Sequence, residues 1–305
     1  MNVLISIIIP TYNRAHTLPR AINSVLKQDY PTWELIIIDD GSQDNTRQLL
    51  NNYKNPRIHI YYHEANKGAL AAKNTGINHA RGDWFTILDS DDEMNEQALS
   101  TLIQVPERID PKIDAVSCNC IDSQTGKFSG YFLKSGMEHD QYLDAETIMR
   151  YCRGEFWGIT RLNLLHGERF DERTSAENSL WCKLNLHAHR FYIHRGLRIY
   201  HTEGNDRVTQ FYRKLESKVT YDRFISLEED IEYLRQLKEW AQDSYRGYIF
   251  NKGITCIYQR DRARALECFR ELDRYPGGKL RSLILFGGLI IGPSFIRMFL
   301  SLRSE

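Results

Sequence analysis

The stretch Ile5-Ser-Ile-Ile-Ile-Pro-Thr-Tyr-Asn13 joins a run of β-branched apolar residues to a polar turn. The same arrangement recurs at 35–42, Leu-Ile-Ile-Ile-Asp-Asp-Gly-Ser, and at 84–92, Trp-Phe-Thr-Ile-Leu-Asp-Ser-Asp-Asp. Short apolar runs bounded by turn residues are typical of strands that are buried on both faces of a parallel sheet. The first ninety residues are therefore predicted to contain strands at 3–9, 35–38, 57–62 and 84–88.

Segments with helical periodicity separate the predicted strands. Apolar residues recur at helical spacing over 18–26, and small and apolar residues do so over 69–80. Strands that alternate with such helices form parallel sheets, because each helix carries the chain back across one face of the sheet. We predict an α/β fold with a Rossmann-like, mostly parallel sheet flanked by helices.

Polar clusters stand at the carboxyl ends of three predicted strands. Residues 10–13 follow the first, Asp39-Asp40-Gly41-Ser42 follows the second, and Asp89-Ser90-Asp91-Asp92 follows the fourth. In open α/β sheets, ligands bind beyond the carboxyl ends of the strands. The three segments are therefore predicted to converge on one binding site.

The composition argues against several classes of protein. The 305 residues suffice for a large buried core, and 40 Lys and Arg balance 40 Asp and Glu, so no basic field attracts nucleic acid. The six cysteines show no paired CxxC spacing, which argues against a structural zinc or a disulfide framework. Met1 is followed by an apolar run without the basic segment of a signal peptide, so we expect no export and a cytoplasmic location.

The second half of the chain has weaker patterns. Mixed strands and loops are expected to extend the sheet over 106–210. A helical region is expected over 211–305, strongly charged over 211–275 and with a break at 276–278. Within that region, 282–296 carries no charge, and basic residues flank it at Lys279, Arg281, Arg297 and Arg303.

The apolar segment 282–296 admits two interpretations. It is shorter than the roughly 20 residues that a membrane-spanning helix needs, and Gly287-Gly288 and Gly292-Pro293 are expected to interrupt it. Residues 279–303 would then contact a membrane surface peripherally. The alternative is a helix packed against the globular body or against a second copy of the chain.

The acidic cluster carries the strongest chemical signal. Asp89, Asp91 and Asp92 place three carboxylates within four residues after an apolar strand, and their repulsion favours a bound cation. Carboxylate oxygens suit Mg²⁺ or Mn²⁺, which can bridge a diphosphate. A solvated acidic turn before a helix is the alternative. The chain contains neither GxGxxG nor GxxxxGK, so nucleotide binding would depend on carboxylates and metal.

Four motifs follow one another in the first hundred residues. They are Ile5-Ser-Ile-Ile-Ile-Pro-Thr-Tyr-Asn-Arg14, Ile38-Asp-Asp-Gly-Ser-Gln-Asp-Asn-Thr46, Asn66-Lys-Gly with Asn74-Thr-Gly76, and Leu88-Asp-Ser-Asp-Asp92. This series resembles the family 2 glycosyltransferases of GT-A fold, strongly over the first hundred residues and weakly beyond. The resemblance implies a GT-A domain at 1–210, with a nucleotide-sugar half at 1–105 and an acceptor half at 106–210, before the helical extension.

The resemblance also implies a donor site. The ring of Tyr12 would lie against uracil or another base, Asp40 would accept a hydrogen bond from that base, and Lys73 stands where the family often has Arg. Which of Asp91 and Asp92 would bind the metal directly stays open. The donor-binding residues implied are Pro10, Thr11, Tyr12, Asp39, Asp40, Lys73, Asp89 and Arg207, and the metal ligands are Asp91, Asp92 and His201.

The second half of the family usually carries a Glu-Asp pair whose Asp is the catalytic base. Alignment on Leu180, Lys183 and Leu184 places Glu177 at that position and Ala176 where the preceding Glu would be. A shift of one residue would place Asn178 there, which has no basic carboxylate to deprotonate an acceptor.

The predicted function is therefore metal-dependent, inverting transfer of a sugar from a nucleotide-sugar, expected to be a UDP-sugar, to a hydroxyl of a glycan or lipid-linked glycan. Such an enzyme of cell-surface polysaccharide synthesis, lipopolysaccharide included, would work at the inner face of the cytoplasmic membrane. One alternative is a nucleotidyltransferase, which would require a glycine-rich basic loop in place of residues 10–13. The other is a non-catalytic glycan- or partner-binding module of the same fold.

Overall fold

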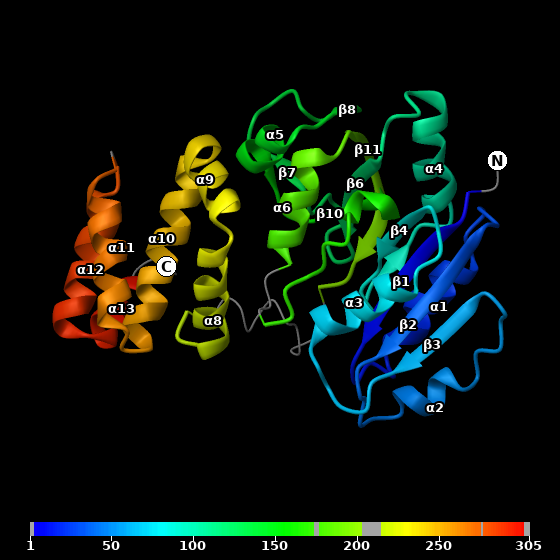
Figure 1. Ribbon diagram of the computed structural model, residues 1–305, viewed down its shortest axis with the longest axis horizontal. Helices are drawn as coiled ribbons and strands as arrows, with labels where there is room; N and C mark the ends of the chain where they lie inside the picture. Colours follow the sequence, from blue (N-terminus) through cyan, green and yellow to red (C-terminus); the bar gives the residue numbers. More distant parts are fainter. Residues whose placement is uncertain (1–2, 174–176, 203–214, 276, 302–305) are drawn as a thin grey trace. The chain divides into compact units, whose positions relative to one another are not determined.

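The computed structural model describes residues 3–173, 177–202, 215–275 and 277–301 (Figure 1). The chain forms two compact units: 1–172 with 177–203, called here the sheet unit, and 173–176 with 204–305, called the helical unit. The predicted boundary at 210/211 lies outside the described residues.

The sheet unit is built on a nine-stranded sheet among its described residues. The strands follow the order β3-β2-β1-β4-β10-β6-β11-β5, and β8 pairs with β11. Their bounds are β1 Ile5–Thr11, β2 Trp33–Asp39, β3 Ile58–Tyr62, β4 Trp84–Ile87, β5 Glu93–Met94, β6 Ala115–Asp122, β8 Gln141–Tyr142, β10 Phe156–Arg161 and β11 Arg190–Tyr200; β7 Tyr131–Phe132 and β9 Cys152–Arg153 form a separate pair.

The direction of the strands decides which residues meet at the edge of the sheet. β1 pairs in parallel with β2 and β4, β2 with β3, and β6 with β11. β10 is antiparallel to both β4 and β6. The prediction of a mostly parallel sheet is confirmed, and the reversed β10 brings its first residues to the carboxyl ends of its neighbours.

Alternate residues of the buried strands pack against helices on opposite faces. Ile7 and Ile9 of β1 share a core with α1 Leu18–Leu26 and α4 Ala98–Arg108, whereas Ile8 shares one with α3 Ala69–His79 and α6 Asn178–His187. A Cβ at Gly76 of α3 would lie 2.3 Å from the Ile8 side chain, so glycine is needed for this close packing. The shorter helices are α2 Thr46–Leu50, α5 Ala145–Tyr151 and the 3₁₀ turn η1 Leu162–Leu165.

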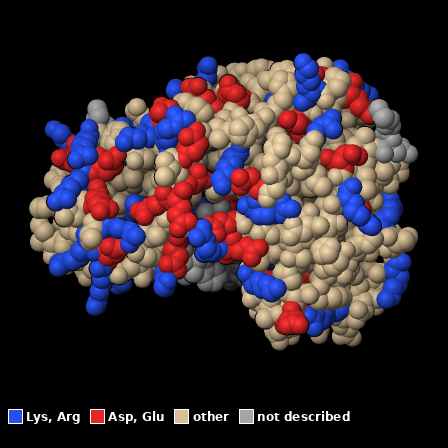
Figure 2. All heavy atoms as spheres, in the orientation of Figure 1, with Lys and Arg blue, Asp and Glu red and all other residues tan. Residues whose placement is uncertain are grey.

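The helical unit packs around α10. This helix is buried on most of its faces and contacts α8, α9, α11 and α12. The elements are α8 Lys218–Ser226, η2 Leu227–Glu229, α9 Ile231–Trp240, α10 Gln242–Tyr258, α11 Arg262–Asp273, α12 Lys279–Ile291 and α13 Pro293–Ser301. On the face drawn in Figure 2, acidic and basic side chains both occur on this unit and on the sheet unit.

The apolar segment forms a helical hairpin. Gly292, at φ 95°, ends α12 as expected, but Gly287 and Gly288 lie inside α12 and do not interrupt it, so that expectation was wrong. A Cβ at Gly288 would lie 2.7 Å from Ile296, which shows that these glycines let α13 pack closely on α12. Among the described residues, no helix is both long and apolar enough to cross a membrane.

Candidate active site

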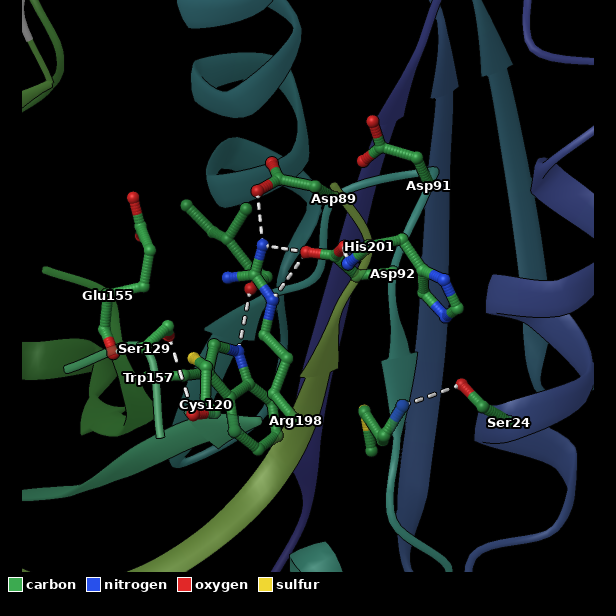
Figure 3. Close-up of polar contacts among 12 residues, drawn as sticks. Ser24, Asp89, Asp91, Asp92, Cys120, Ser129, Glu155, Trp157, Arg198 and His201 are labelled. Carbon is green, nitrogen blue, oxygen red and sulfur yellow. Dashed lines mark hydrogen bonds and ion pairs between the residues drawn. The ribbon is translucent and has the colours of Figure 1, made fainter. Parts of the chain in front are cut away.

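An arginine on β11 organises the acidic cluster at the carboxyl end of β4. Because β11 runs parallel to β6, and β6 parallel to β4, the last residues of β11 reach the edge where Asp89 stands. Arg198 Nη2 lies 2.5 Å from Asp89 Oδ2, and Arg198 Nε donates to Asp92 Oδ2 at 2.7 Å (Figure 3). One guanidinium therefore pairs with two of the three predicted carboxylates.

Burial opposes the charges in these ion pairs, and the partners have to offset it. Asp92 is 1% exposed and Arg198 is 6% exposed. Burial alone would lower the pKa of Arg198, but Asp89 and Asp92 raise it above its usual range, so the guanidinium stays charged. Burial likewise would raise the pKa of Asp89, yet Lys73 and Arg198 lower it to about 2. Asp89 is thus ionised throughout the physiological range.

A second cation links the two halves of the sheet unit. Lys73 of α3 is 4% exposed, and its Nζ lies 2.5 Å from Glu177 Oε1 and 3.8 Å from Asp89 Oδ1. Burial alone would lower the pKa of Lys73, but the charges of Glu177 and Asp89 raise it. Lys73 therefore brings the predicted base Glu177 close to Asp89, a predicted donor-binding residue. Lys73 and Glu177 themselves are 104 positions apart in the sequence.

The third carboxylate of the cluster differs from its neighbours. Asp91 makes no side-chain hydrogen bond or ion pair with any residue that the structure describes; only its carbonyl oxygen accepts, from Arg20. Asp92, by contrast, accepts from Arg198 and from the backbone N–H of His201 at 2.8 Å. Asp91 and Asp92 thus have different surroundings, which sequence alone did not reveal.

His201 lies beside this cluster but is engaged elsewhere. Its Nε2 is 2.7 Å from Glu93 Oε1, and Glu93 also faces Arg20 at 3.8 Å. No group of three His, Cys, Asp or Glu side chains within the described ranges is arranged to hold a metal ion. Arg207 and Ala176 lie outside the described residues.

The predicted base-binding segments form the other end of the site. Tyr12 is 40% exposed, whereas the neighbouring Thr11 hydroxyl is buried and has no hydrogen-bond partner in the described part of the chain. Pro10 lies within β1, paired with Ile38 of β2.

Both carboxylates of Asp39-Asp40 accept hydrogen bonds from the protein. Asp39 accepts from the Ser42 N–H at 3.0 Å and from Arg47 at 3.3 Å. Asp40 lies 2.6 Å from His63 Nδ1 and accepts from the backbone N–H groups of Lys67 and Gly68 at 2.9 and 2.8 Å. A nucleotide base would share Asp40 with these donors, so its predicted role stays a prediction.

Sequence reasoning missed two charged residues of this site, Arg198 and Glu155. Arg198 stands between Leu197 and Ile199 in β11, but the same strand also carries Arg190, His194 and Arg195, so the sequence offered no signal that distinguished it. Glu155 directly precedes β10, and the charges of Arg198, Asp89, Glu177 and Lys73 all act on it. Only the strand pairing shows that either residue lies beside Asp89.

Comparison with known proteins identifies the fold and the family. Residues 6–161, which are 156 of the 305, match the family described as Glycosyl transferase family 2. The chain belongs to this glycosyltransferase family. It is 35% identical over 211 residues to the GalNAc(5)-diNAcBac-PP-undecaprenol beta-1,3-glucosyltransferase of Campylobacter jejuni subsp. jejuni serotype O:2, and the match covers 67% of each chain.

Two further comparisons concern a named relative and a solved structure. The Escherichia coli protein WfgD, named UDP-Glc:alpha-D-GlcNAc-diphosphoundecaprenol beta-1,3-glucosyltransferase, is 47% identical over 89 residues, 29% of this chain and 35% of that protein. The structure of S. aureus TarS 1–349 in complex with UDP-GlcNAc aligns with a TM-score of 0.60 at 19% identity, covering 87% of this chain and 89% of that one. The predicted GT-A glycosyltransferase fold is confirmed, and the family favours a glycosyltransferase over a nucleotidyltransferase.

Proposed function

We propose that this glycosyltransferase moves a sugar from a UDP-sugar to a hydroxyl of a lipid-linked glycan, with inversion at the anomeric carbon, in the synthesis of a cell-surface polysaccharide such as lipopolysaccharide. The observation that carries the proposal is the position of Asp89 between Lys73 and Arg198, beside Asp91, whose carboxylate pairs with no residue in the described part of the chain. Such a site provides both cations for phosphate and carboxylates for sugar hydroxyls. The names of the Campylobacter jejuni protein and WfgD support a polyprenyl-diphosphate acceptor, and that of WfgD supports a UDP-linked donor.

The donor would lie along the carboxyl ends of β1, β2 and β4. The exposed ring of Tyr12 offers an apolar face to the base, and the unsatisfied hydroxyl of Thr11 lies next to it. The diphosphate would then lie toward Lys73 and the sugar toward Asp89. Because Lys73 contacts both Glu177 and Asp89, a bound diphosphate would compete with Glu177 for the same ammonium group.

We further propose Mn²⁺ or Mg²⁺ as the cofactor, held by Asp91. Four carboxylates, Asp89, Asp92, Glu155 and Glu177, lie around the two cations Lys73 and Arg198, and Asp91 lies beside Asp92, so the site carries excess negative charge. Mg²⁺ often takes only one or two protein carboxylates together with substrate phosphates and water. When bound, the ion would neutralise charge on the departing diphosphate. Asp92 would support this site through Arg198, and His201 would have to leave Glu93 to become a ligand.

Glu177 is the proposed base. It stands immediately before α6, and its side chain is 42% exposed beside Lys73. It would accept the proton of the acceptor hydroxyl while the hydroxyl oxygen bonds to the anomeric carbon and the bond from that carbon to the diphosphate breaks. One displacement from the face opposite the leaving group gives inversion.

The helical unit is proposed to contact the membrane in which a lipid-linked acceptor would lie. Leu283 and Ile290 of α12 are 63% and 65% exposed, and seven positions place them on one face of the helix. The exposed apolar residues of the hairpin, named here the apolar stripe, are Leu280, Leu283, Phe286, Ile290, Ile291 and Met298. Lys279 and Arg297 stand at its ends, and basic residues favour anionic headgroups. Such a contact would place the enzyme at the inner face of the cytoplasmic membrane.

A donor screen tests the proposal. The purified chain would be incubated with a panel of nucleotide-sugars, a synthetic polyprenyl-diphosphate-linked N-acetylglucosamine and Mn²⁺, and products would be identified by mass spectrometry. We expect transfer from at least one UDP-sugar, with inverted anomeric configuration by NMR, and its loss in EDTA. Transfer only from other nucleotide-sugars, retained configuration, or full activity in EDTA would each contradict one part of the proposal. Nucleotidyl transfer instead of sugar transfer would contradict all of it.

A further inference from the structure

Glu155 reaches the active site because β10 runs against its neighbours. Thr160 pairs with Phe85 in antiparallel register, so the residues before Thr160 lie beside those after Phe85. The Trp157 indole N–H donates to the Ile87 carbonyl at 2.9 Å and continues this alignment to the end of β4. The residue that precedes β10 is thus carried to the edge where Asp89 stands, as Figure 3 shows.

The backbone around Glu155 is closely packed. Gly154 has a φ of +83°, and a Cβ there would lie 2.1 Å from the Ser129 carbonyl oxygen. A Cβ at Gly130 would lie 2.7 Å from the Glu155 carbonyl oxygen, and the buried Asn119 amide bonds to both the N–H and the carbonyl of Gly130 at 2.9 Å. Two glycines thus bring two chain segments together and hold the backbone from which the Glu155 side chain projects.

The Glu155 carboxylate has no partner of its own. Lys73 pairs with Glu177 and Asp89, and Arg198 pairs with Asp89 and Asp92, whereas Glu155 makes no side-chain hydrogen bond or ion pair within the described residues. Burial raises the pKa of Glu155, and the nearby Arg198 only partly offsets that effect. A half-buried carboxylate without donors is unfavourable, and a bound hydroxyl would relieve it.

The order of the strands gives the side of the site on which Glu155 acts. The segments assigned to the nucleotide follow β1 and β2, and β4 with Asp89 comes next in the sheet. β10 lies on the other side of β4 from β1. Glu155 is therefore separated from the base pocket by the position of the transferred sugar, which is where an acceptor has to approach.

We propose that Glu155 binds a hydroxyl group of the acceptor sugar and orients it toward the anomeric carbon. This inference rests on the proposed transferase function and adds a second carboxylate to the acceptor side. Glu155 accepts a hydrogen bond and keeps its charge, while the proton of the reacting hydroxyl passes to Glu177. Two carboxylates in fixed positions would select an acceptor by the spacing of its hydroxyls.

Glu155→Gln tests the inference, because it keeps the shape of the side chain and removes its charge. Losing a hydrogen bond to a charged group should lower kcat/KM for the polyprenyl-diphosphate-linked N-acetylglucosamine by about 10- to 100-fold. We expect most of this change as a rise in acceptor KM. The Kd of UDP, measured calorimetrically with Mn²⁺, should stay within about twofold, since Glu155 lies away from the base pocket. Glu146→Gln on the surface helix α5 is the matched control and should behave as the unmodified chain.

Several outcomes would overturn the inference. An unchanged acceptor KM would show that Glu155 does not bind the acceptor, and an equal weakening of UDP binding would assign it to the donor. A fall in kcat that removes the base-dependent limb of the pH–rate profile would make Glu155 the base. If the unmodified chain transfers nothing, the proposed function fails; binding of methyl N-acetylglucosaminide followed by NMR with UDP present, with and without Glu155→Gln, then still tests the inference by itself.

Discussion

At the scale of single residues, Arg198 explains why three neighbouring aspartates serve different purposes. Its guanidinium contacts Asp89 and Asp92, whereas the Asp91 side chain lies apart from it in Figure 3. Asp92 is therefore expected to stabilise the fold of the site, and Asp91 is the residue that we propose as the ligand of the cation. The chemical identity of the three residues is the same, so only their positions distinguish them.

Asp91→Asn and Asp92→Asn should consequently fail in different ways. Asp91→Asn should leave thermal stability unchanged and weaken Mn²⁺-dependent UDP binding by about tenfold or more, because a metal ligand is lost. Asp92→Asn should destabilise folding by about 3 kcal/mol, because it breaks a buried ion pair. Calorimetry with and without Mn²⁺ and urea unfolding measure the two effects. Equal metal affinity in Asp91→Asn and the unmodified chain would contradict the assignment.

Glu177→Gln should separate catalysis from donor binding. UDP binding should be nearly intact, whereas kcat should fall by about 10²- to 10⁴-fold, as expected when a general base is lost. Asn178→Ala is the matched control, since a shift of one residue in the alignment would make position 178 the base. A large loss of kcat in Asn178→Ala with little loss in Glu177→Gln would show that the alignment has slipped.

The sequence predicted part of this site because some of its signals are local. Asp89, Asp91 and Asp92 are adjacent in the chain, and their place after an apolar run is visible without a structure. Arg198 and Glu155 are distant in sequence from Asp89, and they reach it only through the register of β11 on β6 and the reversal of β10. Register depends on packing across the whole sheet, which no local pattern specifies.

At the scale of elements, the helices and strands that could be predicted are those whose apolar residues follow one clear pattern along the sequence. β1 to β4 were expected from their apolar runs, and α1 and α3 from helical spacing. α10 was not expected as one helix, because it is buried on most sides and lacks a single apolar stripe. Gly287-Gly288 was misread as a break, since glycine also occurs in helices where a second helix packs closely, here α13.

Glu34 of β2 shows how one buried charge joins several elements. Its carboxylate accepts from the Ser6 hydroxyl of β1 at 2.7 Å and from the backbone N–H of Arg81, before β4, at 2.7 Å. Burial would raise the pKa of Glu34, but these hydrogen bonds and the Arg81 guanidinium lower it below its usual value. A lowered folded-state pKa stabilises the fold above the unfolded-state value, and this contribution disappears as the pH falls through the folded-state value.

Glu34→Gln should therefore lower stability near pH 7 and flatten its decline in acid. The loss at pH 7 should be about 1–3 kcal/mol, as for a hydrogen bond to a buried charged group. Urea unfolding between pH 3 and pH 7 measures it, with Glu146→Gln as an exposed control. If Glu34→Gln and the unmodified chain lose stability in parallel below pH 5, Glu34 does not contribute in this way.

At the scale of the whole molecule, the helical unit combines a buried face with an exposed one in the same helix. On α12, Ile284 and Leu285 are 4% and 0% exposed, and Leu285 packs against Gly253 of α10. Removal of the chain after Gly278 would therefore expose the core of this unit and unfold it. Substitution of the apolar stripe alone tests membrane contact without that effect.

Leu283→Glu with Ile290→Glu should abolish binding to vesicles of phosphatidylglycerol and phosphatidylethanolamine, measured by flotation. Each exposed side chain that enters the acyl boundary contributes roughly 1.5–3 kcal/mol, so losing two should reduce partitioning by about 100-fold or more. Ile231→Glu on α9, a residue that is 77% exposed outside the stripe, is the matched control and should still bind. Binding should also weaken at high salt, because Lys279 and Arg297 attract anionic headgroups only over a short screened distance. If the unmodified chain ignores vesicles but forms a dimer that the double substitution dissociates, then the apolar stripe joins two copies of the chain and the membrane proposal is wrong.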